Sequence, residues 1–334
     1  MNSKLSKIYH QTKEEITNHP VLVRKGDNDF AIIIAYFNPC AYVTPILNLK
    51  KVLDNLIEMK IDVFLGEVVC GHSLNLSSLF GNRSNRVFSI NSDTIWFHKE
   101  AIWNLVGRQV SKLYSNLVFL DADIIIIDRD RFVSEVTYGL EHFKVIQPYS
   151  KVCYLRPDGI RGQIRRSAGW AFSRNFLTAY SPKYWSCGFA IAVQNDFFNE
   201  CGGFFQSYLG EGDVRLIAAI LGNFDFVCQR FGTENEWKAF ISWAYSVKAW
   251  CNSSLGVCSG EILHLFHGSL DKRNYDKRIQ YMKGFDPISD VEVNSATGLP
   301  EWSVDARNKK SLMISTFTHH FFERDEDEEL LKNI

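Results

Sequence analysis

Several features that define other protein classes are missing from this sequence of 334 residues. The net charge is only −1, so the chain is no polycation and any contact with nucleic acid has to be local. No apolar run approaches the roughly 18 residues of a membrane-spanning helix, and the polar N-terminus lacks the apolar stretch of a secretory signal. The 8 cysteines are scattered without a CxxC pair, which is typical of reduced thiols. These absences predict a soluble, cytoplasmic protein.

What is present is an alternation of strand-like and helix-like segments from Phe30 onward. Short β-branched runs predict buried parallel strands over 31–36, 61–67, 86–90 and 117–127. Apolar residues at helical spacing predict helices over 44–57 and 94–110, and Thr44 with Pro45 is a suitable start for the first. This order predicts an α/β fold, with a mixed, mostly parallel sheet and helices on both faces. Ligands of such sheets bind beyond the C-terminal ends of the strands.

The second half of the chain departs from this alternation. The pattern predicts a basic loop, a strand with a turn and a short helix over 151–183, 185–204 and 212–222, and an acidic tail, ERDEDEELLK, follows later. There is no internal repeat and no low-complexity linker. The sequence therefore predicts an N-terminal segment, one catalytic domain in two halves, and a C-terminal extension with the acidic tail: 1–29, 30–290 (30–130 and 131–290) and 291–334.

The run NLVFLDADIIIID places Asp121 and Asp123 inside otherwise apolar sequence. An isolated buried carboxylate is costly, so it pairs, protonates or binds a metal. In one interpretation the two carboxylates cap a neighbouring helix or pair with arginine. In the other they converge on a hard cation, Mg²⁺ or Mn²⁺, which favours oxygen ligands. Such a cation commonly neutralises a diphosphate that becomes a leaving group.

Four segments, in order, resemble GT-A-fold, nucleotide-sugar-dependent glycosyltransferases, especially galactosyltransferase-like members. They are a helix before the D-x-D strand, the D-x-D strand, an acceptor-side segment and a C-terminal histidine segment: WFHKEAIWN (96–104), FLDADI (119–124), WSCGFAIAVQNDFFNECGGFFQSYLGEGD (185–213) and HLFHGSLDKRNYDKR (264–278). The resemblance implies a Rossmann-like GT-A fold and transfer of a sugar from a UDP-sugar to an acceptor hydroxyl. It also implies Mn²⁺ or Mg²⁺ as cofactor.

The resemblance further implies roles for the metal-site residues. Asp123 takes the place of the principal metal ligand, and Asp121 binds the ribose or the metal shell. His267 matches the C-terminal histidine that completes the coordination, with His264 as the alternative; histidine suits Mn²⁺ beside carboxylates. For either histidine, a structural hydrogen bond is the competing interpretation.

Asp213 takes the place of the general base of inverting members of the family. Those members usually carry a Glu-Asp pair before a helix, whereas this sequence reads Gly-Glu-Gly-Asp. Glu211 is displaced by one position and Gly212 stands where the pair has glutamate. Either carboxylate can therefore be the base. Alternatively, Glu211 and Asp213 cap the helix that follows, since carboxylates favour helix N-termini.

The remaining predicted contacts concern the donor and the floor of the acceptor pocket. The resemblance places the nucleotide against Tyr36, Asn38, Glu67 and Lys99 and the acceptor against Trp185 and Gly188. A carboxylate at Glu67 can accept from uracil or ribose, which predicts a preference for UDP-sugars over GDP-sugars, and Lys99 can reach the diphosphate. An ordinary loop or core role is the alternative for each.

The basic segment 151–183 predicts a polyanionic acceptor. Its bases outnumber its single acid, Asp158, and aromatic residues lie between them: Lys151, Arg156, Arg161, Arg165, Arg166, Arg174 and Lys183. Such a segment can neutralise phosphates and stack on bases. DNA containing 5-hydroxymethylcytosine, as in viruses that glycosylate their genomes, is the favoured acceptor and would present a flipped base to Arg161, Arg165 and Arg166. A solvated face paired with acids elsewhere is the structural alternative.

Three other functions compete with DNA modification. Synthesis of a cell-surface polysaccharide or lipopolysaccharide needs the same donor chemistry. An inactive nucleotide-sugar-binding homologue stays open because the Glu-Asp pair is interrupted. A sugar-nucleotide pyrophosphorylase should carry a Gly-rich basic loop after the first strand, and AYFNPCAY (35–42) is no such loop.

Overall fold

A seven-stranded sheet forms the centre of the computed structural model, which describes residues 3–23, 26, 28–71, 75–76, 85–176, 185–269, 271–274 and 277–332. From edge to edge the strands are β3 (Val87–Asn91), β2 (Asp62–Val69), β1 (Phe30–Phe37), β4 (Asn116–Asp121), β10 (Ala190–Gln194), β6 (Val145–Gln147) and β11 (Gly256–Val257). Among the described strands of this sheet, only β10 pairs antiparallel with its neighbours, and the other pairs are parallel. The predicted mixed, mostly parallel α/β sheet is confirmed.

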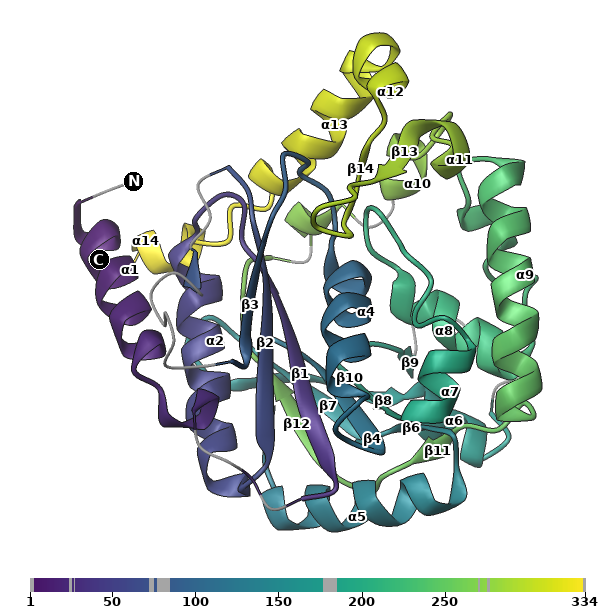
Figure 1. Ribbon diagram of the computed structural model, residues 1–334. Coiled ribbons are helices and arrows are strands. Elements are labelled where there is room, and N and C mark those ends of the chain that lie inside the picture. The colour runs from purple at the N-terminus through teal and green to yellow at the C-terminus, as the bar shows by residue number, and fades with distance from the viewer. Residues whose placement is uncertain are drawn as a thin grey trace.

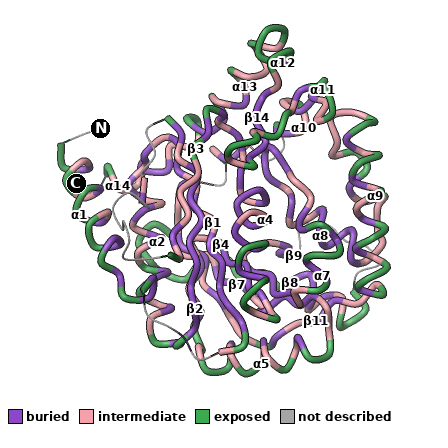
Figure 2. Tube along the Cα trace, viewed as in Figure 1, coloured by how far each residue is buried: buried purple, intermediate pink, exposed green. Residues whose placement is uncertain are grey.

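Helices cover both faces of this sheet because successive side chains of β1 point to opposite sides (Figure 1). Ile32 and Ile34 enter the core beneath α1 (Ser3–Thr17), α2 (Val43–Leu56) and α5 (Arg129–His142). Ala31 and Ile33 enter the opposite core beneath α4 (Lys99–Val110), α7 (Asn195–Glu200), α8 (Gly212–Leu221) and α9 (Glu234–Cys251). Figure 2 shows the strands buried and the outer sides of α1 and α9 exposed. Each fully buried isoleucine stabilises the fold by about 1.5–3 kcal/mol.

A second sheet lies beside the C-terminal end of β4. Its strands, in order, are β5 (Ile124–Ile126), β12 (Glu261–His264), β7 (Lys151–Leu155), β8 (Arg161–Ser167) and β9 (Trp185–Ser186). The prediction of one continuous strand over 117–127 is therefore wrong. The chain leaves the first sheet at Asp121, turns, and enters the second sheet as β5, because Ile124 and Ile126 pack into the core there.

The basic segment is also more ordered than predicted. A loop over 151–183 was expected, but residues 151–167 form the antiparallel β7–β8 hairpin, followed by α6 (Ala168–Ser173). The hairpin forms because Val152 and Cys153 are buried in the sheet, whereas the arginines of β8 stay at least partly exposed. Residues 177–184, and Lys183 with them, lie outside the described residues.

The C-terminal extension packs through a third apolar core rather than trailing away. In this cluster the ring of Trp96 contacts Phe285 and Trp302, that of Tyr208 contacts Phe285, and that of Trp302 contacts Phe317. The elements here are α10 (Arg278–Tyr281), α11 (Pro287–Asp290), β13 (Val291–Val293), β14 (Pro300–Trp302), α12 (Val304–Lys309), α13 (Ser311–Phe322) and α14 (Glu328–Lys332). In Figure 1 the last of these, α14, returns to lie near α1 and α2.

The acidic tail supplies the cap of α2. Thr44 was predicted to begin this helix, but Tyr42 is its N-cap residue and offers no side-chain cap. Instead, the backbone N–H groups of Val43 and Thr44 donate to the two carboxylate oxygens of Asp327, at 2.9 and 2.8 Å. A carboxylate at a helix N-terminus is favourable because it meets free N–H groups and the positive end of the helix dipole.

Two expectations from composition can be compared with the structure. None of the described helices combines the length and apolar character that crossing a membrane requires. All 8 cysteines are free, as predicted, and most of them are buried. The cytoplasmic location stays a prediction.

Candidate active site

The two aspartates of the D-x-D motif lie at the junction of the two sheets. Asp121 ends β4, and its neighbour across the sheet is Ala35 of β1. Asp123 occupies the turn before β5, and its backbone carbonyl accepts from Leu265, just beyond β12. Strand β12 pairs with β5 and thereby carries the C-terminal histidines to the D-x-D turn. This is the C-terminal edge of the parallel strands, where ligands of α/β sheets bind.

Asp123, His264 and His267 form a compact group of potential metal ligands. One ligand atom of each residue lies within 4.8 Å of those of the other two. Among the described residues, no other set of three or more histidine, cysteine or acidic side chains comes this close together. Nε2 of His267 is 2.8 Å and Nε2 of His264 is 3.7 Å from Asp123 Oδ2, and the two Nε2 atoms are 3.2 Å apart. Asp123 Oδ1 is buried without a hydrogen-bond partner in the described structure. An orphaned carboxylate oxygen beside two imidazole nitrogens fits a divalent cation such as Mn²⁺.

The protonation of these groups follows from burial and charge. Burial raises the pKa of Asp123, but His264 and His267 outweigh it and hold that pKa well below its usual range. Burial lowers the pKa of His264 to about 3, so its ring is neutral at physiological pH. For His267, burial and Arg273 lower the pKa, yet Asp123 and Glu326 outweigh them and raise it. An ionised carboxylate and a neutral imidazole are the forms that bind metals.

A carboxylate from the acidic tail lies behind His267. Oε1 of Glu326 is 3.4 Å from Nδ1 of His267 and 2.6 Å from the guanidinium of Arg324. Although burial raises the pKa of Glu326, Arg324 and His267 lower it to about 2, so the group is ionised. A carboxylate on the second ring nitrogen orients a metal-binding histidine and fixes its tautomer.

Lys99 connects the D-x-D motif with the predicted base. It begins α4, and its Nζ lies 3.3 Å from Asp121 Oδ1 and 2.6 Å from Asp213 Oδ1. Burial lowers the pKa of Lys99, but the two carboxylates outweigh it and raise it, so the ammonium group is charged. Burial raises the pKa of Asp121 to about 7; the charges of Asp213 and Asp123 raise it further, whereas Lys99 lowers it. Asp121 thus lies outside the histidine group, and its predicted role as metal ligand stays a prediction.

Glu211 and Asp213 do not cap α8, contrary to one interpretation of the sequence. Glu211 is the N-cap residue but adopts a left-handed φ of 81° and makes no side-chain cap hydrogen bond. Its carboxylate pairs with Arg230, whereas that of Asp213 pairs with Lys99. The two candidate bases are therefore held by different cations. Asp213 therefore lies toward the D-x-D motif, whereas Glu211 is bound to Arg230 of the short 3₁₀ helix Cys228–Arg230.

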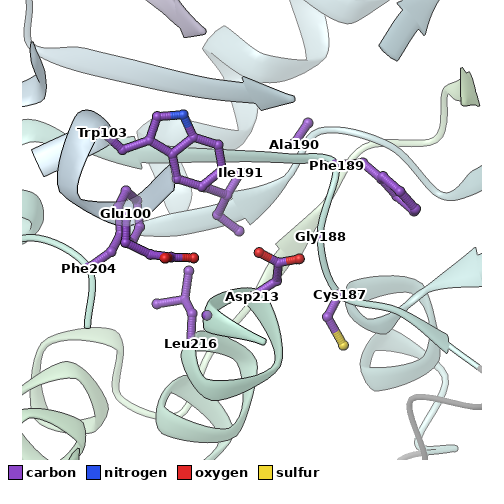
Figure 3. Close-up of a pocket in the computed structure, with 11 residues that line it drawn as sticks. Glu100, Trp103, Cys187, Gly188, Phe189, Ala190, Ile191, Phe204, Asp213 and Leu216 are labelled. Carbon is purple, nitrogen blue, oxygen red and sulfur yellow. The ribbon is translucent and has the colours of Figure 1, made fainter. Parts of the chain in front are cut away.

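A small pocket lies beside Asp213, and Figure 3 shows its lining. Trp103, Phe204 and Leu216 contribute apolar walls, and Gly188 passes close to Asp213. A side chain at Gly188 would place its Cβ 2.0 Å from Asp213 Oδ2, so this position requires glycine. The free volume is about 20 Å³, which is room for one water molecule or a group of that size.

The residues predicted to hold the nucleobase are buried and bonded within the protein. The amide of Asn38 donates to the hydroxyl of Tyr36 at 3.1 Å and to the carbonyl of Tyr42 at 2.7 Å. Glu67 Oε2 accepts from the backbone of Leu76 and from Ser89, each at 2.7 Å. Burial raises the pKa of Glu67 to about 7. Their contact with a nucleotide stays a prediction.

The predicted acceptor residues fall into two places. Gly188 lines the pocket beside Asp213, whereas Trp185 packs against Trp170, with ring centroids 6.2 Å apart. Arg161 pairs with Glu261, while Arg165 and Arg166 lie over the rings of Tyr154 and Trp170, at 5.4 and 4.6 Å. Within the described ranges no carboxylate pairs with either Arg165 or Arg166. Neither arginine pairs with the acidic tail, whose ion pairs among the described residues are with His267, Lys272, His319, Arg324 and Lys332.

Three site residues were missed or underweighted by the sequence. His264 joins the group together with His267, and the short spacing of the two in HLFH was a usable signal. Glu326 comes from the acidic tail, to which the sequence assigned no role in the site. Glu100 lines the pocket beside Asp213, yet its place in a helical pattern carried no signal.

Comparisons with known proteins give a distant likeness. No protein-family model and no curated protein sequence matches the chain. S. aureus TarS 1–349 is 10% identical over 71% of this chain and 60% of that one, with a TM-score of 0.42. The catalytic domain of Drosophila β1,4-galactosyltransferase 7 in complex with xylobiose is 9% identical over 85% of this chain and 98% of that one, with a TM-score of 0.39. Glucosyl-3-phosphoglycerate synthase from Mycobacterium tuberculosis, in complex with Mg²⁺ and UDP, is 12% identical over 88% of this chain and 91% of that one, with a TM-score of 0.38.

The likeness concerns the arrangement of the chain only. The chain spans less than two thirds of the length of the TarS structure. Similarity at this level does not place it in a family, so its chemistry has to follow from its own residues.

Proposed function

We propose that the chain is a metal-dependent glycosyltransferase that moves a sugar from a UDP-sugar to an acceptor hydroxyl. The observation that carries this proposal is the group of Asp123, His264 and His267 at the end of the D-x-D strand, joined through Asp121 and Lys99 to Asp213. Lys99 thus contacts the D-x-D motif through Asp121 and the candidate base Asp213, which supports a candidate cation site and a candidate base in one active site. Transfer between a diphosphate leaving group and an incoming hydroxyl requires this pairing of functions.

On the donor side, Asp123, His264 and His267 would hold Mn²⁺ or Mg²⁺. When bound, the cation supplies positive charge that stabilises the departing diphosphate. Lys99 adds a second charge next to Asp121, and its raised pKa keeps it cationic throughout the physiological range. Asp121, close to Lys99, is placed to accept from a ribose hydroxyl. The donor is thereby positioned by groups from β4, β12 and α4.

On the acceptor side, Asp213 would take the proton of the attacking hydroxyl. The hydroxyl oxygen forms the new bond to the anomeric carbon, the bond from that carbon to the diphosphate oxygen breaks, and its electron pair leaves with UDP. Attack opposite the leaving group inverts the anomeric centre. Lys99 pairs with Asp213 and holds its carboxylate on the side of the D-x-D motif. Glu211 is the weaker candidate because Arg230 holds it.

For the acceptor, we favour a polyanion, and among polyanions DNA containing 5-hydroxymethylcytosine. Support comes from β8, where Arg165 and Arg166 lie over aromatic rings with no described carboxylate to neutralise them. The ring of Tyr154 beneath Arg165 is 5.0 Å from that of His264, so this basic surface adjoins the cation site. A flipped base needs phosphate contacts of this kind at the rim of the site. Cell-surface glycans remain the competing acceptors.

Turnover of sugar nucleotides in the presence and absence of chelator tests the proposal. UDP-sugars should be hydrolysed or transferred with Mn²⁺ present, and chelator or Asp123→Ala should abolish turnover while the thermal unfolding transition stays intact. Asp130→Ala, at an exposed position in the same half of the domain, serves as the matched control. Full activity in excess chelator would contradict the metal role. Metal-dependent UDP binding without any turnover would instead identify an inactive homologue.

The acceptor is tested separately by incubating duplex DNA with the sugar nucleotide that is turned over. Duplexes containing 5-hydroxymethylcytosine should gain the mass of one sugar, and unmodified duplexes should gain none because cytosine presents no hydroxyl. Sugar transfer to a polysaccharide or lipopolysaccharide with no transfer to hydroxymethylated DNA would refute the DNA assignment and leave the donor chemistry standing.

A further inference from the structure

Glu100 is a buried carboxyl group beside Asp213. It is the second residue of α4, directly after Lys99, and only 2% of its surface is exposed. Neither of its carboxylate oxygens has a well-formed hydrogen bond among the described residues, although the backbone groups of Glu100 and Ser207 lie near enough to lower its pKa. In Figure 3 the Glu100 and Asp213 carboxyl groups point toward one another across the pocket. A buried acid left without partners is costly, which calls for an explanation at this site.

The close approach of Glu100 depends on Gly212. A side chain at position 212 would place its Cβ 2.0 Å from Glu100 Oε1 and 2.5 Å from its Cδ. Gly212 interrupts the expected acidic pair before α8, and the space that this creates is filled by the carboxyl group of Glu100 from α4. The site therefore still presents two carboxyl groups next to each other, although they come from different elements.

We propose that Glu100 is an acceptor-binding residue, whose carboxyl group receives a polar hydrogen of the acceptor next to the hydroxyl that Asp213 deprotonates. This inference rests on the proposed transferase function. The free space of about 20 Å³ suits one hydroxyl or amino group. The walls formed by Trp103, Phe204 and Leu216 exclude bulk water, which strengthens a hydrogen bond made there. A hydroxyl of a sugar and the exocyclic amine of a cytosine base both supply such a hydrogen.

The charges around Glu100 make its role sensitive to pH. Burial raises the pKa of Glu100 to about 7, Lys99 from its own helix opposes this shift, and Asp213 from α8 adds to it. Ionisation near neutral pH converts Glu100 from a group that can also donate into a pure acceptor. Binding of a donor group of the acceptor should therefore tighten as the pH rises from about 6 to about 8, through a step near 7.

Kinetics of Glu100→Gln and Glu100→Ala test the proposal, with duplex DNA containing 5-hydroxymethylcytosine and a set of methyl glycosides as acceptor probes. For the probe that wild type uses, both variants should raise the acceptor KM, by about tenfold for Gln and more for Ala, and remove its pH dependence near 7. Mn²⁺-dependent binding of UDP and donor hydrolysis should change less than about twofold, because both variants keep Lys99, Asp121, Asp123 and the two histidines that are assigned to the donor side. Gln109→Glu, at an exposed position near the end of α4, is the control for a changed charge in this helix.

Gly212→Ala provides a second variant that leaves Glu100 in the sequence. Its methyl group should displace the carboxyl group, raise the acceptor KM and add little to Glu100→Ala in the double variant. An unchanged acceptor KM and pH profile in Glu100→Gln and Glu100→Ala would overturn the proposal. So would equal losses in UDP binding and acceptor KM, which indicate a structural role. Failure of the proposed function looks different, since wild type itself would then show neither metal-dependent UDP binding nor turnover.

Discussion

Replacing Glu326 by glutamine tests whether the acidic tail tunes the candidate cation site. Glu326 is buried and ionised, with its Oε1 3.4 Å from Nδ1 of His267. An ionised carboxylate at this distance requires the hydrogen of the neutral ring on Nδ1, which leaves the lone pair of Nε2 directed at the Asp123 side. Glutamine keeps the size of the side chain but removes the charge that fixes this tautomer. The cation site should therefore persist with a weaker affinity.

The expected loss can be bounded from the geometry. Removal of an outer carboxylate behind a metal-binding histidine typically costs about 10–100-fold in metal affinity. A separation of 3.4 Å is at the long end for a hydrogen bond, and Arg324, at 2.6 Å, already holds part of the carboxylate charge. Both facts favour the lower end of the range. We expect Mn²⁺ to bind the variant about tenfold more weakly, or about 1.4 kcal/mol.

Calorimetric titration of Mn²⁺ in the presence of saturating UDP measures this difference directly. Glu323→Gln is the matched control, because Glu323 belongs to the same segment, is 38% exposed and does not contact His267. It should bind Mn²⁺ as wild type does. If Glu326→Gln also matches wild type while melting at the same temperature, His267 does not depend on the tail and the reasoning fails. Loss of the whole thermal transition would mean that Glu326 serves folding, which the Glu323 control separates from a general effect of charge.

Three further predictions address the base, the basic surface and a buried acid. Asp213→Asn should slow transfer by at least about a hundredfold with UDP affinity nearly unchanged, and Glu211→Gln should do less; the opposite ranking in single-turnover rates would make Glu211 the base. Replacing Arg165 and Arg166 together by alanine should flatten the salt dependence of DNA binding and leave donor hydrolysis unchanged; an unaltered slope would show that β8 does not hold phosphates. Burial raises the pKa of Glu67 to about 7 in the folded protein, so its neutral carboxyl group favours folding fully at a pH below the pKa of the unfolded chain. This contribution is lost as the pH rises through 7. Glu67→Gln should therefore gain stability relative to wild type between about pH 5 and pH 8, by up to roughly 3 kcal/mol, and melting temperatures that stay parallel across this range would contradict the shift.

Local patterns in the sequence were sufficient for the first three strands and for two of the helices. β-branched runs predicted β1, β2 and β3 near their observed bounds, and the apolar spacing predicted α2 and α4, because each signal lies within the element itself. The break after Asp121 was not predictable in this way. Four isoleucines in a row read as a continuation of the strand, and what ends it is the pairing of β5 with β12, far along the chain.

The start of α2 shows the same limitation on a smaller scale. Thr44 is a good capping residue by type, but Asp327 occupies the helix N-terminus, so a contact across nearly the whole chain overrides the local signal. The candidate site behaves similarly. Asp121, Asp123, His267 and Asp213 were predicted from motifs, whereas the placement of Glu100 depends on the absence of a side chain at another position, which no pattern within α4 records.

The tail connects these observations into one constraint on the site. Asp327 binds the N-terminus of α2, and the adjacent Glu326 binds His267, so neighbouring residues attach the end of the chain both to the first βα unit and to the cation-binding group. His267 in turn reaches Asp123 only because β12 pairs with β5. Each of these contacts joins segments distant in sequence and carries a loop-closure entropy cost that only the assembled fold offsets. The geometry of the candidate cation site therefore depends on contacts between distant segments of the folded chain, and the D-x-D triplet by itself cannot create it.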